Sequence, residues 1–328
     1  MTPLQFEQQY RPVWSELQTL LEQAEAARAQ AFDGNRLASL YRRSCEHLAL
    51  AQARAYPVHL VDELEALTHR AHRLIYRRSG GLVAAWRRQL LVGFPQAVRA
   101  HAGYVALAAA LFIVPLLVVG VLAWRDPGFI LHLMDASQVA QFDDMYGDGE
   151  HAIGALREAD TDWRMFGHYI WNNIGIGFQC YAGGIFFGLF SVVCLVFNGL
   201  FIGAVAGYLT ARGHGDNFYP FVVTHGAFEL TAIVLSGAAG LRLGHSLLAP
   251  GRRTRLASLR HAASESIVLV YGVFALLLVA AGVEAFWSSS RWVIPAVKYT
   301  VGGVCWVAVL AYLGWQGRPV VVRESHAR

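Results

Sequence analysis

Charged residues are scarce in this chain, and lysine is nearly absent. Asp, Glu, Lys and Arg make up 15% of its 328 residues, whereas an ordinary soluble domain has about a quarter. Hydrophobic residues make up 55%, and the mean hydropathy is +0.37. Lys298 is the sole lysine, so arginine carries nearly all the positive charge. This composition excludes an ordinary soluble protein and predicts an integral membrane protein.

Motifs that would identify an enzyme are also missing. The four cysteines, Cys45, Cys180, Cys194 and Cys305, show neither a CxxC pair nor a His-Cys metal spacing, so we expect them to be packing residues. There is no Walker-type phosphate loop and no GxSxG turn, which argues against ATP hydrolysis and serine hydrolase chemistry. We therefore assign no catalytic residue and no cofactor, and an enzymatic activity is the least favoured interpretation.

Long apolar runs are confined to the second part of the chain. Uncharged stretches of the roughly 20 residues that cross a bilayer begin near Ala102. No apolar segment follows Met1, so we expect no cleavable signal peptide. The pattern predicts an all-α, polytopic helical membrane protein with about six transmembrane helices and an N-terminal cytoplasmic helical bundle. The expected spans are residues 102–124, 164–181, 185–208, 221–243, 266–287 and 296–315.

The distribution of arginine predicts the orientation of these spans. Residues 70–99 contain seven arginines and no acidic residue, whereas residues 125–163 contain nine acidic residues and two arginines. By the positive-inside rule, the first segment is cytoplasmic and the second is an external loop. The expected domains are a cytoplasmic helical domain at 1–99, a transmembrane domain at 100–317 and a cytoplasmic tail at 318–328. In a five-span alternative, the segment from Trp163 to Tyr181 is interfacial or re-entrant.

The N-terminal region reads as a small helical bundle. Helices are expected at residues 4–31, 36–55, 58–78 and 81–97, with breaks at Gly or Pro between them. Arginines beside a membrane span are explained by topology and anionic lipids, and no aromatic-basic motif accompanies them, so we predict no nucleic-acid partner. The expected partners are the lipid bilayer and other membrane or cytoplasmic proteins.

Glycines recur at helix-contact spacing in the spans. The three series are Gly184-x-x-x-Gly188, Gly199-x-x-x-Gly203-x-x-x-Gly207 and Gly240-x-x-x-Gly244. Small residues at this spacing allow two membrane helices to approach closely. Packing within the chain is the favoured interpretation, and a homo-oligomer is the alternative.

Six polar residues lie within the predicted spans, where an unpaired polar group is costly and an ionisable one indicates function by default. They are Asn172, Asn173, Asn198, His225, Glu229 and Glu284. His225 and Glu229 are four residues apart, so they share one helix face. The expected depths of these side chains predict one polar cluster in the outer half of the membrane. His225, Glu229 and Glu284 are candidate metal ligands, and a purely structural pair of His225 with Glu229 is the alternative.

The segment Thr224-His225-Gly226-Ala227-Phe228-Glu229-Leu230-Thr231-Ala232-Ile233 resembles the His-Gly-x-x-Glu-Leu hallmark of the stage II sporulation protein M family of bacterial membrane proteins. The resemblance extends along the membrane half, in the family's order, and into the N-terminal half. The further matching stretches are Asn172-Asn173, Phe197-Asn198-Gly199, Gly240-Leu241-Arg242-Leu243-Gly244, Glu284-Ala285-Phe286, Leu40-Tyr41-Arg42, Leu48-Ala49-x-Ala51 and Arg70-Ala71-His72-x-x-Ile75-Tyr76.

In spore formers, this resemblance implies a membrane scaffold that holds peptidoglycan-degrading partners during engulfment. The long arginine-rich N-terminal region is similar to a branch of the family found in bacteria that form no spores. We therefore expect a scaffold or envelope-complex component in a bacterial inner membrane, with the N-terminus in the cytoplasm. The alternative is a transporter or channel-like component that binds a cation, a proton or a small solute in the polar cluster.

Overall fold

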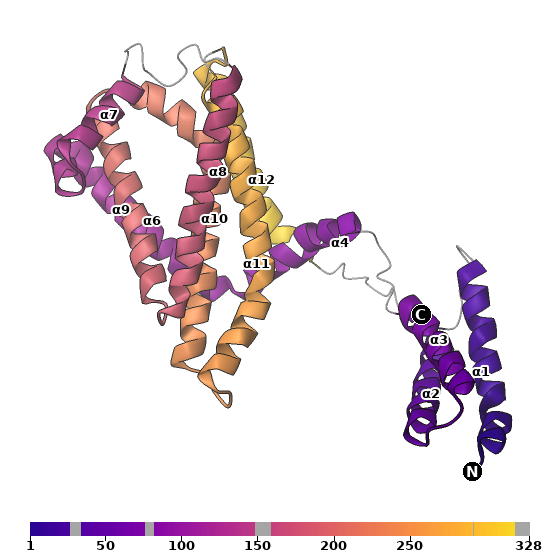
Figure 1. Ribbon diagram of the computed structural model, residues 1–328. Helices are drawn as coiled ribbons and strands as arrows, with labels where there is room; N and C mark the ends of the chain where they lie inside the picture. Colours follow the sequence, from indigo (N-terminus) through magenta and orange to yellow (C-terminus); the bar gives the residue numbers. More distant parts are fainter. Residues whose placement is uncertain (27–33, 76–81, 148–158, 291, 319–328) are drawn as a thin grey trace, which may run out of the picture. The chain divides into compact units, whose positions relative to one another are not determined.

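The computed structural model describes residues 1–26, 34–75, 82–147, 159–290 and 292–318, and it divides into two compact units. Unit 1 is Met1–Ala84 and unit 2 is Ala85–Arg328. The described residues form helices and the turns between them (Figure 1). The predicted all-α class is confirmed. The C-terminal tail from residue 319 and part of the acidic loop, 148–158, lie outside the described residues.

Unit 1 contains α1 (Pro3–Ala26), α2 (Gly34–Ala53) and α3 (Val58–Ile75). Each helix buries an apolar stripe in a core that the three share. Its large members include Phe6, Trp14, Leu17, Leu40 and Leu64. The unit has a water-soluble pattern, because the polar residues between these positions face outward.

Most of the predicted fourth helix of the N-terminal bundle, from Ala85 onward, belongs to unit 2. It is divided into α4 (Leu82–Arg88), the π-helical segment η1 (Gln89–Gly93) and α5 (Phe94–Ala100). Phe94 is 1% exposed and packs against Gly272, and the Tyr312 hydroxyl donates to the Leu90 carbonyl. The first compact unit therefore ends at Ala84, whereas the cytoplasmic domain was expected to reach residue 99. The aromatic contacts of the arginine-flanked segment draw it into the membrane unit.

Unit 2 is built on six long helices: α6 (Ala102–Arg125), α8 (Ala159–Ala182), α9 (Leu189–Ala211), α10 (Gly215–Leu248), α11 (Arg255–Val283) and α12 (Pro295–Trp315). Among the described residues, five helices are long and apolar enough to cross a membrane, namely α6, α9, α10, α12 and α11 with its extension to Ser288. This confirms a polytopic membrane protein. The more polar α8 is 24 residues long and packs on α10 and α11, so the sixth span stays a prediction.

Side-chain contacts define two opposite ends of unit 2. At one end, Arg99 donates to the carbonyls of Leu313 and Gln316, and Arg242 donates to His101. The α8–α9 turn and the α10–α11 turn lie at this end (Figure 1). The other end holds η2 (Pro127–His132), α7 (Ala136–Tyr146), the α9–α10 turn and the α11–α12 turn. The long helices therefore alternate in direction, and the acidic and arginine-rich connections lie at opposite ends.

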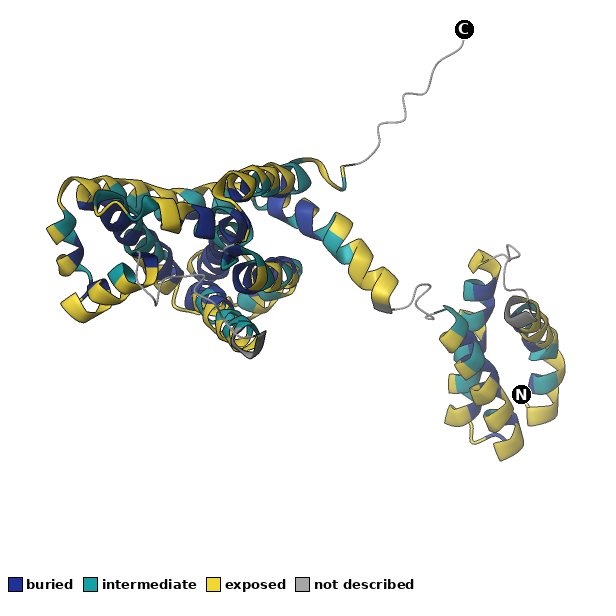
Figure 2. Ribbon diagram, turned by 90° about the horizontal axis from the view of Figure 1, so that it is seen from above, coloured by how far each residue is buried: buried dark blue, intermediate teal, exposed yellow. Residues whose placement is uncertain are grey.

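The glycine series pack helices of the same chain against one another. A Cβ atom on Gly199, Gly203 or Gly207 would lie 2.1–2.3 Å from a backbone oxygen of α6. In the α8–α9 turn, a Cβ atom on Gly184 would lie 2.1 Å from the Gly240 carbonyl oxygen of α10, and one on Gly244 of α10 would lie 2.3 Å from the Gly188 nitrogen. These contacts explain the three series by packing within the chain, as favoured above. Many large apolar residues of unit 2 are exposed, and lipid would surround them. Figure 2 shows exposed positions along its long helices.

Candidate intramembrane site

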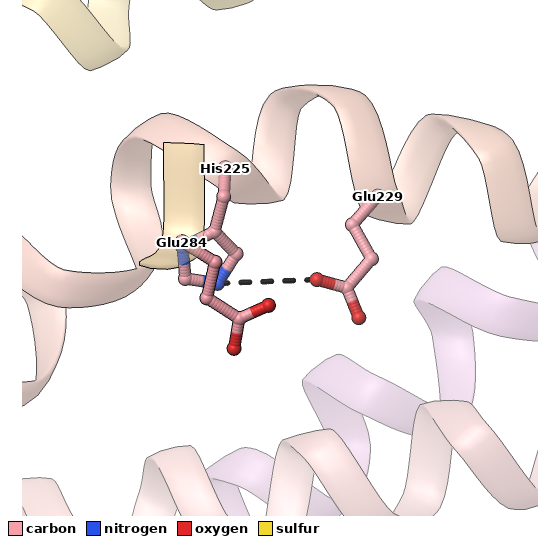
Figure 3. A group of neighbouring side chains, drawn as sticks. All are labelled: His225, Glu229 and Glu284. Atoms are coloured by element: carbon pink, nitrogen blue, oxygen red, sulfur yellow. Dashed lines mark ion pairs between the residues drawn. The ribbon is translucent and has the colours of Figure 1, made fainter. Parts of the chain in front are cut away.

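The site is centred on α10, the most buried of the five membrane-capable helices. His225 and Glu229 lie one helical turn apart, and the distance between His225 Nε2 and Glu229 Oε2 is 3.9 Å (Figure 3). His225 is 5% exposed, and its ring packs edge-on against Phe221. The predicted shared face is therefore present, and both side chains point to the same space.

Glu284 reaches this space from the end of α11. There the helix widens into the π-helical segment η4 (Glu284–Ser288), a local geometry that is frequent at functional sites. The two ends of η4 both serve the site. The Glu284 carboxylate faces His225 and Glu229 (Figure 3), and Ser288 Oγ lies 3.0 Å from His225 Nδ1.

The asparagines behave differently from one another. Asn173 of α8 is 2% exposed, and its Nδ2 lies 3.5 Å from Glu284 Oε2. Asn172 is exposed and donates to Asn173 Oδ1 at 3.0 Å. Asn198 instead donates to the carbonyl of Cys194 on its own helix, at 2.8 Å. The structure thus joins Asn173 to the cluster directly and Asn172 through it, whereas the side-chain hydrogen bond of Asn198 is local to α9.

Sequence reasoning missed two residues near the site, Ser288 and Lys298. The Nζ atom of Lys298 donates to the Ser288 carbonyl at 2.7 Å, and the Thr224 hydroxyl lies 3.4 Å from the Lys298 carbonyl. Lys298 is 7% exposed despite its charge. Its position at the start of a predicted span was a usable signal, because a lone lysine in an apolar helix demands a partner. Ser288 carried no such signal.

Two cavities adjoin the cluster, each of about 350 Å³. The first is lined mainly by apolar and aromatic side chains of α6, α7, α9, α10 and α12, and its polar wall includes His225, Glu229 and Glu284. The second is polar and is lined by Asp216, Asn217, Ser288 and Lys298 among others. The carboxylates therefore face space that is large enough for water and a small ligand.

The negative charge of the two glutamates is not neutralised by a lysine or arginine among the described residues. Among the described residues, neither Glu229 nor Glu284 forms an ion pair with Lys or Arg, and Glu229 pairs with His225 alone. The nitrogen and oxygen donors of His225, Glu229 and Glu284 all lie within 4.8 Å of one another. Such a group can bind a cation or exchange protons with the cavity, because carboxylates and imidazole are both cation ligands and proton acceptors.

The family models that match this chain divide it into two parts, as the structure does. Residues 96–289, more than half of the chain, match the family model described as stage II sporulation protein M. Residues 4–77 match a model described as a domain of unknown function. An uncharacterized protein of Methanocaldococcus jannaschii is 30% identical over 77 residues, which are 23% of this chain and 43% of that protein. The match thus spans less than half of the archaeal relative. No solved structure matches the chain.

Proposed function

This chain belongs to the stage II sporulation protein M family, and we propose that it is a non-catalytic scaffold of a bacterial envelope complex that recruits a partner protein through unit 1. The observation that carries the proposal is the division of the molecule. All five membrane-capable helices lie in unit 2, whereas unit 1 has a separate core and a polar surface. A helical unit of this kind, attached to a membrane bundle, is suited to hold a soluble partner at the membrane.

The proposed membrane is the bacterial inner membrane, with unit 1 in the cytoplasm. The end of unit 2 that contains Arg99 and Arg242 also carries the connection with Arg252, Arg253 and Arg255. The opposite end carries the acidic residues of α7, Asp143 and Asp144 among them. This charge difference supports a cytoplasmic arginine-rich end under the positive-inside rule.

Recruitment is tested by comparing the proteins retained by the full chain with those retained by a chain of residues 85–328. Isotope-labelled membranes are solubilised gently, and a tag at the C-terminus is used for both chains. The truncation begins at Ala85 because removing Phe94 would damage the membrane core. We expect a stoichiometric partner that is lost from the truncated chain. Equal retention by both chains, or no stoichiometric partner at all, contradicts the proposal.

Point variants sharpen this test without removing the unit. Leu4 and Val58 are 66% and 73% exposed on unit 1, so aspartate at either position changes the surface and leaves the core intact. The matched control is Gln9→Asp, which adds the same charge at an exposed polar position of α1. We expect Leu4→Asp or Val58→Asp to lower partner retention more than Gln9→Asp does.

Orientation is tested by labelling single cysteines in a background without native cysteine. Ser137 on α7 and Arg252 between α10 and α11 are both exposed and lie at opposite ends of unit 2. An impermeant maleimide added to intact spheroplasts should label Ser137→Cys, and it should label Arg252→Cys only after permeabilisation. Labelling of both before permeabilisation would exclude the proposed topology.

A second candidate function is transport, and the cavity of about 350 Å³ beside His225, Glu229 and Glu284 favours it. Transport proteins place ionisable residues in such cavities within the membrane. The test is flux of protons or divalent cations into liposomes that contain the purified full chain, compared with the Glu229→Gln variant. Flux that the variant abolishes would favour transport over the scaffold, and flux equal to that of empty liposomes would remove it.

A further inference from the structure

Among the residues that the structure describes, no lysine or arginine forms an ion pair with the two carboxylates of the intramembrane site. Glu229 is close to His225, and Glu284 is close to Asn173, which is neutral. The nearby ammonium of Lys298 donates to the Ser288 carbonyl. Burial of two carboxylates in a low-dielectric region is costly unless protons or a cation neutralise them. A divalent cation bound by both would balance their charge.

The arrangement of donors matches a metal site in number and type. His225 Nε2 and one oxygen from each of Glu229 and Glu284 lie within 4.8 Å of one another. Zinc binds such ligands at about 2.0–2.2 Å in tetrahedral geometry, which sets ligand-to-ligand distances of about 3.3 Å. The three groups must close in by about 1.5 Å or less to reach that distance. Rotation about the side-chain bonds of two glutamates provides this movement without a change in the backbone.

Neighbouring polar side chains orient two of the proposed ligands toward a metal ion. Ser288 Oγ lies 3.0 Å from His225 Nδ1, so when Nδ1–H donates to the serine, the Nε2 lone pair is directed at the carboxylates. Asn173 Nδ2 approaches Glu284 Oε2 at 3.5 Å, which leaves Oε1 available to a ligand. Metal-binding histidines and carboxylates are generally held by such outer contacts. The π-helical segment η4 places Glu284 and Ser288 together at the site.

The cavity provides access and a vacant coordination position. It has a volume of about 350 Å³ and is lined by all three donors. One imidazole, two carboxylates and no thiolate are a ligand set for Zn²⁺, whereas Mg²⁺ and Ca²⁺ prefer oxygen ligands alone. With three protein ligands, the fourth position would face the cavity and hold water or another small donor.

We propose that His225, Glu229 and Glu284 bind one Zn²⁺ ion in the membrane unit, with Ser288 and Asn173 as positioning residues. The site does not depend on recruitment through unit 1, so loss of either proposal leaves the other standing. The ion would lie at the wall of the cavity that these three residues line. It also explains why a histidine and two carboxylates meet there with no lysine or arginine partner among the described residues.

The test is Zn²⁺ binding by the purified full chain in lipid nanodiscs, with a tag that contains no histidine. The protein is stripped with a chelator, reloaded with Zn²⁺ alone, and assayed by elemental analysis and by competition with a chromophoric chelator. We expect about one Zn²⁺ per chain, and at least about 100-fold weaker binding after His225→Gln, Glu229→Gln or Glu284→Gln, since each removes one of three ligands. Ser288→Ala should weaken binding about 10-fold.

His132→Gln is the matched control, because His132 is an exposed histidine of unit 2 at the end of η2, outside the cluster. It should bind Zn²⁺ as the unmodified chain does. Co²⁺ absorption of the unmodified chain gives a second readout that does not depend on any variant's folding. It should show the d–d bands of a low-coordinate nitrogen and oxygen site. Absence of tight Zn²⁺ binding by the unmodified chain, or binding unchanged in all three ligand variants, would overturn the proposal.

Discussion

The two units of this protein are stabilised in opposite ways. In unit 1, large apolar side chains such as Phe6 and Leu17 are fully buried, and polar residues cover the surface. In unit 2, large apolar residues such as Leu117 and Phe186 are exposed, whereas α10 buries many glycines, alanines and serines. This difference between the units follows from the solvent that surrounds each of them. Water drives large apolar groups together, but lipid does not, so close backbone packing and polar contacts hold the membrane helices.

The largest expected effect comes from filling one of the close helix contacts in unit 2. A Cβ atom at Gly240 would lie 2.3 Å from both the Cys180 carbonyl oxygen and Ser191 Oγ. Gly240→Val should therefore prevent stable packing of α10 against the α8–α9 hairpin, at a cost of about 3 kcal/mol or more. Gly303→Val is the matched control, because a Cβ there meets nothing within 4 Å. The melting temperature of each detergent-solubilised variant is measured by the loss of its folded peak in size-exclusion chromatography. It should be lower for Gly240→Val than for Gly303→Val, and equal melting temperatures would contradict this account of the glycines.

A leucine pair tests the comparison directly. Leu17 is fully buried in unit 1, and Leu117 is 58% exposed on α6. Leu17→Ala should cost about 2–5 kcal/mol, because it removes apolar contact and leaves a cavity, whereas Leu117→Ala should cost less than about 0.5 kcal/mol. Hydrogen exchange of the full chain in nanodiscs measures both. Amides of α1 to α3 should exchange faster in the first variant alone. A similar loss from Leu117→Ala would mean that an unobserved contact covers this face.

A smaller effect should come from pH in unit 1. Trp14 Nε1–H donates to Nδ1 of the buried His47 at 3.0 Å, and burial lowers the pKa of His47 below its usual value. The unfolded unit then binds more protons than the folded one, so stability is full above about pH 6.5 and falls as the pH drops below it. Protonation of Nδ1 would also remove the acceptor for Trp14.

Hydrogen exchange at about pH 7.5 and about pH 5.5, corrected for intrinsic rates, measures this effect in the full chain. Protection of α1 and α2 should fall at the lower pH, and that of α10 should change less. In His47→Gln the pH dependence should shrink, although overall stability is lower. Unchanged protection between the two pH values would show that His47 does not couple folding of unit 1 to protonation.

Much of the fold was accessible from sequence because hydropathy is a local property. The predicted span 102–124 coincides with α6 to within one residue, and 296–315 does so with α12. Prediction was weaker where tertiary contacts decide. The helix expected at 81–97 joined unit 2 because Phe94 packs against Gly272, and α9 begins four residues later than the expected span at 185.

The candidate site was accessible in part. His225 and Glu229 share a helix face by spacing alone, so their proximity followed from the sequence. The approach of Glu284 to them rested on estimated depth, and the structure brings the three together. Asn198 is also a polar residue within a predicted span, but its side chain donates to the Cys194 carbonyl of its own helix. Ser288 was not recognised from the sequence. A serine near the end of a span can be solvated there, so its position does not indicate that it needs a buried partner.

The sequence by itself determined that this protein is helical, spans a membrane several times and has a polar N-terminal part. Those properties depend on composition and on the need of every backbone group in lipid to bond within its own helix. Only the tertiary structure decided which helices touch, where unit 1 ends and which polar residues meet at His225. The physical reason is that helix pairing depends on complementary surfaces, such as Gly184 against Gly240. Such a match belongs to two segments together and is written in neither one alone.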